Sequence, residues 1–241
     1  MIEEKLITIG EAARILRISI DTLRRWNKTG KLVPIKISSA GYRLYSKSQI
    51  ELFLNDLFAT AMKWVLENIE IQSQFYCSNS AIFQAKLTQM QDLLMTNSKK
   101  LPDIFALITA IAGEIGNNSF DHNLGNWPDT PGIFFAYDIH KKIIVIADRG
   151  LGVLATLKRV RPELKDDAMA IKVAFTEIVS GRSPENRGNG LKFVNKIVSE
   201  NPIDLIFKTG DAELTLTKNN KNLNIHLSSK PFRGCLALIT F

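Results

Sequence analysis

The stretch Ile143-Ile-Val-Ile-Ala147-Asp148-Arg-Gly150-Leu-Gly152 decides the fold of the larger part of the chain. Its first five residues are apolar and mostly β-branched, which predicts a buried strand. An acidic residue and two glycines follow directly where this strand ends. The carboxylate of Asp148 can accept a hydrogen bond from the amino group of a base, and glycine lets a ligand approach the backbone closely. The stretch therefore predicts a ligand pocket at a strand end.

Two further segments, one on each side of this strand, fit the same pocket. Upstream, a predicted helix carries Glu114 and Asn118 one turn apart, beside its apolar stripe. That stripe consists of Ile104, Ile108, Ile111 and Ile115. A carboxylate and a carboxamide so placed can supply a general base and an oxygen ligand for a hard cation. Downstream, Gly188-Asn-Gly190 follows Arg187 and opens a helix, so free backbone N–H groups there can bind phosphate.

The remaining strands are predicted around these segments. Residues 132–137 and 143–147 form a hairpin, and four short strands are expected near the end of the chain. Those four are residues 203–207, 214–217, 223–227 and 236–241. Cys77 follows two aromatic residues, Phe75 and Tyr76, and is interpreted as a packed apolar side chain rather than a nucleophile.

The order of these segments resembles the GHKL superfamily, which includes ATP-binding domains of the gyrase, histidine-kinase and MutL types. The resemblance covers residues 80–241 and rests on Glu114 and Asn118, on Asp148, Gly150 and Gly152, and on Gly188 and Gly190. It implies a two-layer α/β sandwich of the Bergerat type. Such a sandwich has a mixed, mostly antiparallel sheet with helices on one face.

Roles for single residues follow from this resemblance. It implies that Asn118 binds the Mg²⁺ that bridges the ATP phosphates, and that Asp148 accepts a hydrogen bond from the adenine amino group. The glycines and Arg187 then surround the nucleotide, and Glu114 orients or deprotonates the attacking water. One departure stands out: Arg233-Gly-Cys235 occupies the place where many relatives have Gly-Thr before the last strand.

Basic residues concentrate in the first part of the chain. Of the formal net charge of +7, +5 lies in residues 1–55, which hold ten Lys and Arg against five Asp and Glu. A basic module beside a nearly neutral remainder is typical of nucleic-acid binding.

Within that module, the sequence predicts two short helices followed by a hairpin. Thr8 and Glu11 have the spacing of a capping box for the first helix, and Ser19 can cap the second. In the second helix the apolar residues Ile20, Leu23 and Trp26 are predicted to face inward. The residues predicted to face outward, where a DNA major groove can receive them, are Thr22, Arg24, Arg25 and Lys28.

The hairpin completes a winged helix-turn-helix. Arg43 lies near its predicted tip, where it can contact a phosphate. The pattern resembles the MerR-type winged helix through Ile9-Gly-Glu-Ala-Ala13, Thr22-Leu-Arg-Arg-Trp26, Gly30-Lys-Leu32 and Gly41-Tyr-Arg-Leu-Tyr45. The resemblance implies binding to double-stranded DNA, usually as a dimer.

Two other interpretations stay open at this point. The first module also fits a small three-helix module for protein interaction. Gly150-Leu-Gly152-Val-Leu-Ala155 also fits a Rossmann fingerprint, although the acidic residue expected about 20 residues later would fall in a predicted helix. A Walker A motif does not occur in the sequence, which excludes the P-loop route to ATP.

The sequence as a whole predicts an α+β protein with three parts. Residues 1–57 form the winged helix-turn-helix, residues 58–79 connect, and residues 80–241 form the ATP-binding domain. Two cysteines exclude a disulfide framework, and no apolar run is long enough for a membrane helix, so a soluble cytoplasmic protein is expected.

The expected function is that of a DNA-binding regulator whose ATP·Mg²⁺ state controls DNA or partner binding. Slow hydrolysis of ATP and formation of a homodimer are two possibilities that the sequence leaves open. The alternative is a protein serine kinase of the anti-sigma-factor kind, or another ATP-dependent enzyme, in which the winged helix only recruits a protein partner.

Overall fold

The structure is a computed structural model that describes residues 6–16, 18–30, 32–47, 49–50, 57–97, 102–139, 141–178, 190–220 and 222–241. The chain divides into two compact units, residues 1–60 and residues 61–241. Both units combine helices with antiparallel sheets, which confirms the α+β class. Among the described helices, none has the length and apolar character needed to span a membrane.

The first unit holds two helices and a small sheet. Helix α1 (Ile9–Leu16) is followed by α2 (Ile20–Lys28). The antiparallel sheet has the order β1-β3-β2 and consists of β1 (Leu6–Thr8), β2 (Lys36–Ile37) and β3 (Arg43–Ser46). The β2–β3 hairpin is the predicted wing. Strand β1 is an addition, because three residues that lead straight into a helix are too few to show a strand period.

Both helices of the first unit begin at the predicted capping residues. The Thr8 N–H donates to the Glu11 carboxylate at 2.8 Å, and the Glu11 N–H donates to the Thr8 hydroxyl at 3.3 Å, as in a capping box. The Thr22 N–H donates to Ser19 Oγ at 3.1 Å at the start of α2. These contacts fix where the two helices begin.

The inward face of α2 is narrower than predicted. Leu23 is fully buried and Trp26 packs against the same core, but Ile20 is 40% exposed, so the prediction that Ile20 faces inward is wrong. Steps of three residues each fall about 60° short of a full helical turn. Ile20 and Trp26 therefore diverge too far for both to reach one small core.

The second unit is built on a five-stranded sheet. Its strands are β4 (Tyr76–Cys77), β5 (Ile133–Asp138), β6 (Ile143–Asp148), β7 (Asp204–Leu216) and β8 (Asn224–Thr240), in the order β4-β5-β6-β8-β7. Every described strand pair is antiparallel, so the expectation of a mixed sheet is wrong. The reason lies in the connections: the chain crosses from β6 to the far edge, and β8 returns between β6 and β7, antiparallel to both.

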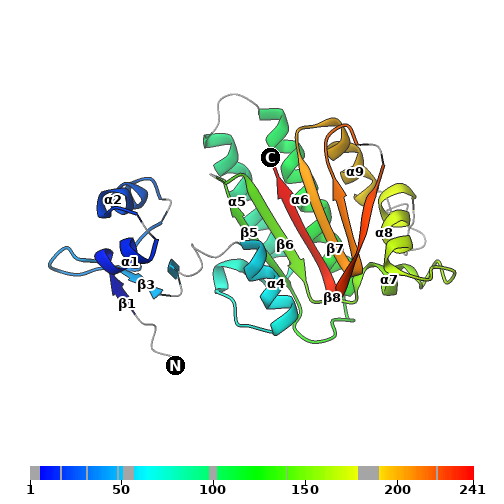
Figure 1. Ribbon diagram of the computed structural model, residues 1–241, viewed down its shortest axis with the longest axis horizontal. Coiled ribbons are helices and arrows are strands. Elements are labelled where there is room, and N and C mark those ends of the chain that lie inside the picture. Colours follow the sequence, from blue (N-terminus) through cyan, green and yellow to red (C-terminus); the bar gives the residue numbers. More distant parts are fainter. Residues whose placement is uncertain are drawn as a thin grey trace. The chain divides into compact units, whose positions relative to one another are not determined.

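Helices cover both faces of this sheet. They are α4 (Leu57–Glu67), α5 (Ser80–Asn97), α6 (Pro102–Asn123), α7 (Gly152–Leu157), α8 (Asp167–Thr176) and α9 (Gly190–Glu200). Phe135 of β5 contacts Phe83 of α5 with 5.1 Å between ring centroids, whereas the adjacent Phe134 contacts Trp64 of α4 at 6.3 Å. Successive strand residues point to opposite faces, so α4 lies opposite α5 (Figure 1). The expectation of helices on one face is therefore wrong, because β5 is apolar on both faces and needs cover on each.

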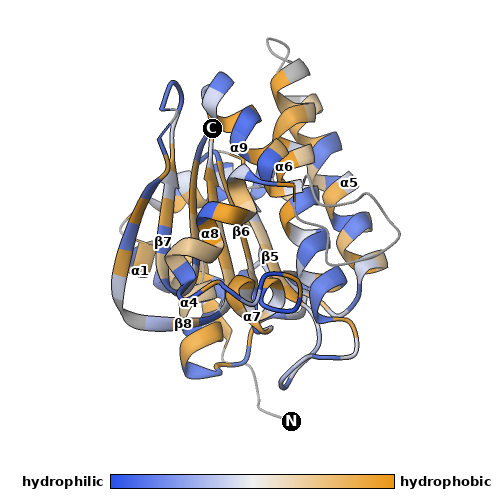
Figure 2. Cartoon of the chain, turned by 90° about the vertical axis from the view of Figure 1, so that its right-hand side faces the viewer, coloured by the Kyte–Doolittle hydropathy of each residue, from blue (hydrophilic) through white to orange (hydrophobic). Residues whose placement is uncertain are grey.

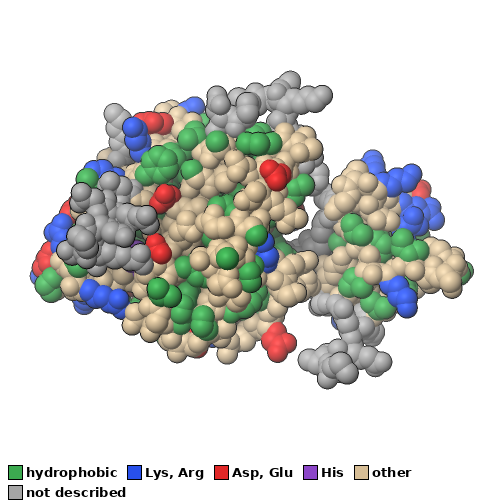
Figure 3. All heavy atoms as spheres, turned by 180° about the vertical axis from the view of Figure 1, so that it is seen from behind, with side chains coloured by type: hydrophobic (Ala, Val, Ile, Leu, Met, Phe, Trp, Pro, Cys, Tyr) green, Lys and Arg blue, Asp and Glu red, His purple; other side chains and the backbone are tan. Residues whose placement is uncertain are grey.

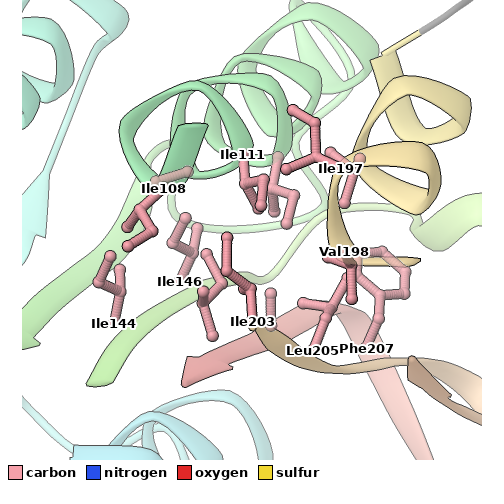
Figure 4. Packing of buried hydrophobic residues seen from close by; sticks show 14 of the residues in the cluster. Ile108, Ile111, Ile144, Ile146, Ile197, Val198, Ile203, Leu205 and Phe207 are labelled. Atoms are coloured by element: carbon pink, nitrogen blue, oxygen red, sulfur yellow. The ribbon is translucent and has the colours of Figure 1, made fainter. Parts of the chain in front are cut away.

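The main core lies between the sheet and α5, α6, α8 and α9. The predicted stripe of α6 is confirmed, since three members are buried and the fourth packs beside them: Ile108, Ile111, Ile115 and Ile104. In Figure 4, side chains of α6 face Ile144 and Ile146 of β6 and Ile197 of α9. Figure 2 shows the same layering, with the strands largely hydrophobic and hydrophilic residues on the outer sides of the helices.

Residues 58–79, expected as a connection, contain most of α4, a short 3-10 helix η1 (Ser73–Phe75) and β4. Strand β4 pairs with β5 at the edge of the sheet. Cys77 is fully buried in the main core, and this burial raises the pKa of its thiol. Both observations agree with the prediction of a packed apolar residue.

The last two strands are longer than predicted. The sequence predicts four short strands here, but β7 and β8 each run through two of them. The pairing shifts register at Gly210, which has φ of 54°, and Gly234 has φ of 73°. Glycine at a β-bulge lets a strand bend and continue, whereas in a sequence it looks like a break.

We expect Phe83→Ala to lower the free energy of unfolding of the second unit by about 3–5 kcal/mol. The Phe83 ring is fully buried and fills the space beside Gly116 of α6, where a Cβ would overlap it. Urea unfolding followed by circular dichroism measures the change. Ile82→Ala is the control, because Ile82 is the neighbouring residue of α5 and is 39% exposed. Equal losses in the two variants would contradict this description of the core.

Candidate functional site

Helix α6 and the start of α9 meet at the first predicted motif. Glu114 and Asn118 are half-buried on α6. A Cβ at position 190 would overlap the Glu114 carboxylate and lie 3.5 Å from Asn118 Nδ2. The lack of a side chain at Gly190, the first residue of α9, therefore lets the amino end of α9 approach α6. The first and third motifs are adjacent, although Arg187 and Gly188 lie outside the described residues.

Asp148, at the end of β6, is buried and surrounded by donors. It is 1% exposed; Ser119 Oγ donates to Oδ2 at 2.7 Å, and the Gly150 N–H donates to Oδ1 at 2.8 Å. Burial raises the pKa of the Asp148 carboxyl, and these hydrogen bonds, with two more from the N–H and thiol of Cys235, oppose the rise. The Ser119 contact joins the second motif to α6.

The two glycines after Asp148 have close neighbours within the protein. A Cβ at Gly150 would overlap the Asn123 carboxamide, whose Oδ1 accepts from the Leu151 N–H at 2.9 Å. Gly152 has φ of 79°, and a Cβ there would lie 2.9 Å from Thr209 Oγ1. The close approaches seen at both positions are to the protein's own side chains. Approach of a ligand to these glycines stays a prediction.

Strand β8 reaches Asp148 through Gly234 and Cys235. A Cβ at Gly234 would overlap the Asp148 backbone oxygen. The Cys235 thiol lies in hydrogen-bonding range of the Asp148 carboxylate and of Thr209 Oγ1, and burial raises the pKa of this thiol well above its ordinary value. The backbone N–H of Cys235 also donates to this carboxylate, so β8 helps to hold the acid. Thr209 of β7 lies nearby, with its Oγ1 3.8 Å from Cys235 Sγ.

Ser119 is not among the predicted site residues, although the sequence contains a signal for it. Ser119 is four residues after Ile115, so it continues the apolar stripe of α6 into the core. A hydroxyl at such a position needs a buried partner, and Asp148 is that partner. Asn123, Thr209 and Gly234 carry no comparable signal, because their partners come from distant segments.

The described residues contain no group of three or more His, Cys, Asp or Glu side chains that could hold a metal ion. A metal held there by protein side chains alone is thus unsupported. Mg²⁺, however, is commonly bound by one or two side-chain oxygens together with substrate phosphates. The carboxamide of Asn118 and the nearby carboxylate of Glu114 fit that smaller requirement.

In the first unit, α2 presents the predicted basic residues to solvent. Arg24, Arg25 and Lys28 are exposed, and Arg24 pairs with Asp21 at 2.9 Å. Thr22 is half-buried, and its hydroxyl lies 2.9 Å from Ser19 Oγ. Figure 3 shows Lys and Arg side chains gathered on the visible face of this unit.

The wing carries Arg43 at the start of β3 rather than at its tip. The turn residue Tyr42 is 70% exposed, whereas Arg43 is half-buried. The Nε of Arg43 is buried and has no hydrogen-bond partner among the described residues. Arg43 can reach a phosphate only with the outer end of its guanidinium.

These elements of the first unit can be compared with known proteins. Residues 8–45 match the family model of the MerR family regulatory protein. The matched range begins at Thr8 of the capping box and ends at Tyr45 in β3, so it contains both helices and the wing. The MerR match supports a MerR-like DNA-binding regulatory domain in this part of the chain and favours it over a module for protein interaction.

The chain is also similar to a small part of a longer protein. Over 64 residues the chain is 38% identical to the type II methyltransferase M.Eco47II of Escherichia coli. The shared stretch is 27% of this chain, and the chain spans only 15% of the methyltransferase. A segment of this size does not carry the activity of the relative to this protein.

We expect Arg24→Ala and Arg25→Ala each to weaken binding of the MerR-like domain to duplex DNA. Each loss of a phosphate contact should also reduce the slope of log affinity against log salt by about one. Fluorescence anisotropy with mixed genomic fragments at several salt concentrations measures both quantities. Lys172→Ala, on an exposed position of α8, is the control. Unchanged affinity in both arginine variants would show that α2 does not read DNA.

Proposed function

We propose that this protein is a DNA-binding regulator whose second unit binds ATP and Mg²⁺ in a site of the GHKL type. The observation that carries the proposal is the meeting of three separate motifs around α6. Gly190 packs against Glu114 and Asn118, while Ser119, the residue after Asn118, binds Asp148. Segments from three parts of the chain thus converge at the residues that the GHKL resemblance assigns to nucleotide binding.

Asp148 is suited to recognise the base of a nucleotide. Its carboxylate has about four acceptor sites, and Ser119 and the N–H groups of Gly150 and Cys235 use three of them. The Cys235 thiol has Thr209 Oγ1 as a second acceptor at 3.8 Å, so the fourth site can pass to the ligand. Asp148 forms no ion pair with a described cation, so its charge is balanced by neutral donors. A buried acceptor of this kind favours a ligand with an N–H group, such as the amino group of adenine, over one that brings a carbonyl.

The phosphate end requires a cation as well as a helix. The amino end of α9 carries free N–H groups and a positive partial charge, which favour an anion. The Glu114 carboxylate lies against the same end and would repel phosphate. Mg²⁺ held by Asn118 would remove this repulsion, because its positive charge would neutralise the charges of the phosphate and the carboxylate. Glu114 is then placed to orient or deprotonate water.

We expect Asp148→Asn to weaken ATP·Mg²⁺ binding by about 10- to 100-fold, because a charge-assisted hydrogen bond to the ligand is lost. Isothermal titration calorimetry with the full chain measures the affinity. Asp92→Asn makes the same change at an exposed position of α5 and should leave the affinity unchanged. Equal affinity of Asp148→Asn and the unmodified protein would remove the GHKL assignment.

We expect slow release of phosphate from ATP, with Glu114→Ala reducing the rate at least about 100-fold, the usual range for loss of a general base. ATP affinity should persist in this variant, since Glu114 does not contact the base. A phosphate-release assay with parallel calorimetry separates the two effects. Turnover in Glu114→Ala that equals the unmodified rate would exclude Glu114 as the base. Transfer of labelled phosphate to a protein serine instead of water would favour the kinase alternative.

A further inference from the structure

Arg149 stands between Asp148 and Gly150 in the chain, but its side chain lies on the opposite face of the sheet. Asp148 binds Ser119 of α6, whereas the Arg149 guanidinium lies over the Trp64 ring of α4, 5.7 Å from its centroid. Consecutive residues at a strand end point to opposite faces. These two neighbours therefore connect the proposed nucleotide site with the helix on the far face.

The guanidinium of Arg149 is buried and held by side chains from two other segments. Arg149 is 6% exposed; its Nη1 donates to Asn68 Oδ1, and its Nη2 forms an ion pair with Asp129. Its Nε is buried and has no hydrogen-bond partner among the described residues. A buried cation that lacks one hydrogen-bond partner depends on its other partners. Moving it away from them would therefore cost free energy. The position of Arg149 is thus tied to Asn68 and Trp64.

A second arginine, Arg233 of β8, also forms an ion pair with the Asp129 carboxylate. Arg233 Nη1 lies 3.2 Å from Asp129 Oδ2, and the next residue, Gly234, packs against the backbone of Asp148. Asp129 therefore joins both segments that frame Asp148. Movement of either segment on ligand binding changes the ion pairs at Asp129 and, through them, the place of Arg149.

Helix α4 follows the DNA-binding domain along the chain. The boundary between the two compact units falls within it, after Thr60. Arg149 contacts the last turn of α4 at Trp64 and the residue that follows the helix, Asn68, which has φ of 55°. A cation at the carboxyl end of a helix is favourable with the helix dipole. A helix moves as a rigid element, so a shift at this end is transmitted along its length.

We propose that Arg149 is a positioning residue that couples nucleotide binding at Asp148 to the DNA affinity of the MerR-like domain through α4. The inference rests on the nucleotide site proposed above. Ligand binding moves the 148–152 turn, Arg149 shifts against Trp64 and Asn68, and α4 carries the change toward residues 57–60. By linkage, DNA binding changes ATP affinity by the same factor.

The coupling is measured as the ratio of DNA dissociation constants with and without ATP and Mg²⁺, using the full chain and mixed genomic duplex fragments. We expect a ratio of at least about fivefold in the unmodified protein, the lower end of typical allosteric coupling. Arg149→Met and Asn68→Gly should bring the ratio close to one while calorimetry still shows ATP binding. Asn68→Gly is the safer variant, because glycine tolerates the positive φ at this position.

Two further measurements separate coupling from a structural role. Lys63→Met removes a cation from an exposed position of the same helix and should retain the full ratio. With Trp26→Phe and Trp127→Phe in place, Trp64 is the remaining tryptophan of the chain. ATP should then change its emission, and adding Arg149→Met should abolish that change.

The outcomes distinguish the two proposals. If ATP binds and the unmodified protein shows a ratio of one, or Asn68→Gly keeps the full ratio, the coupling through Arg149 is wrong and the nucleotide site stands. If calorimetry detects no ATP binding, the proposal of a nucleotide site is wrong, and the proposed coupling, which depends on it, is wrong as well.

Discussion

The hydrogen bond from the Ser119 hydroxyl to the Asp148 carboxylate joins α6 to the end of β6, and the rest of the site depends on it. A carboxylate that is 1% exposed is tolerated only where donors surround it. Those donors come from α6, from the turn after β6 and from β8. All three elements must therefore be in place together. Gly234 follows from the same constraint, since a Cβ there would overlap Asp148 itself, whereas a Cβ at Gly150 would overlap the Asn123 carboxamide.

Local patterns were sufficient for elements whose signal lies within a few residues. The caps of α1 and α2, the apolar stripe of α6 and the β5–β6 hairpin are each confirmed. In each case a periodic pattern or a capping side chain determines the element almost alone. The winged helix was recognisable for the same reason, because its segments follow one another in order within residues 8–45.

Features that depend on distant partners were not predictable in this way. Nothing near Trp64 indicates that its helix covers the face of the sheet opposite α5, because this depends on Phe134 far along the chain. The continuity of β7 and β8 depends on their pairing with each other across Gly210. Likewise, the site motifs identify Asp148 but not the residues that hold it. The apolar stripe of α6 marks Ser119 as buried, but many polar side chains are available as its partner and only the folded sheet pairs it, and Cys235, with Asp148.

The strand order β4-β5-β6-β8-β7 places the last strand of the sequence inside the sheet rather than at its edge. During synthesis, β6 would therefore expose an unpaired edge and β7 would lack its partner strand until residues 224–240 leave the ribosome. Such edges are prone to pair with other chains. The first unit closes its three-stranded sheet within 46 residues and has no such delay. A ribosome-bound chain would therefore carry a folded DNA-binding domain while its larger unit still awaited β8, and chaperone demand should fall on that interval.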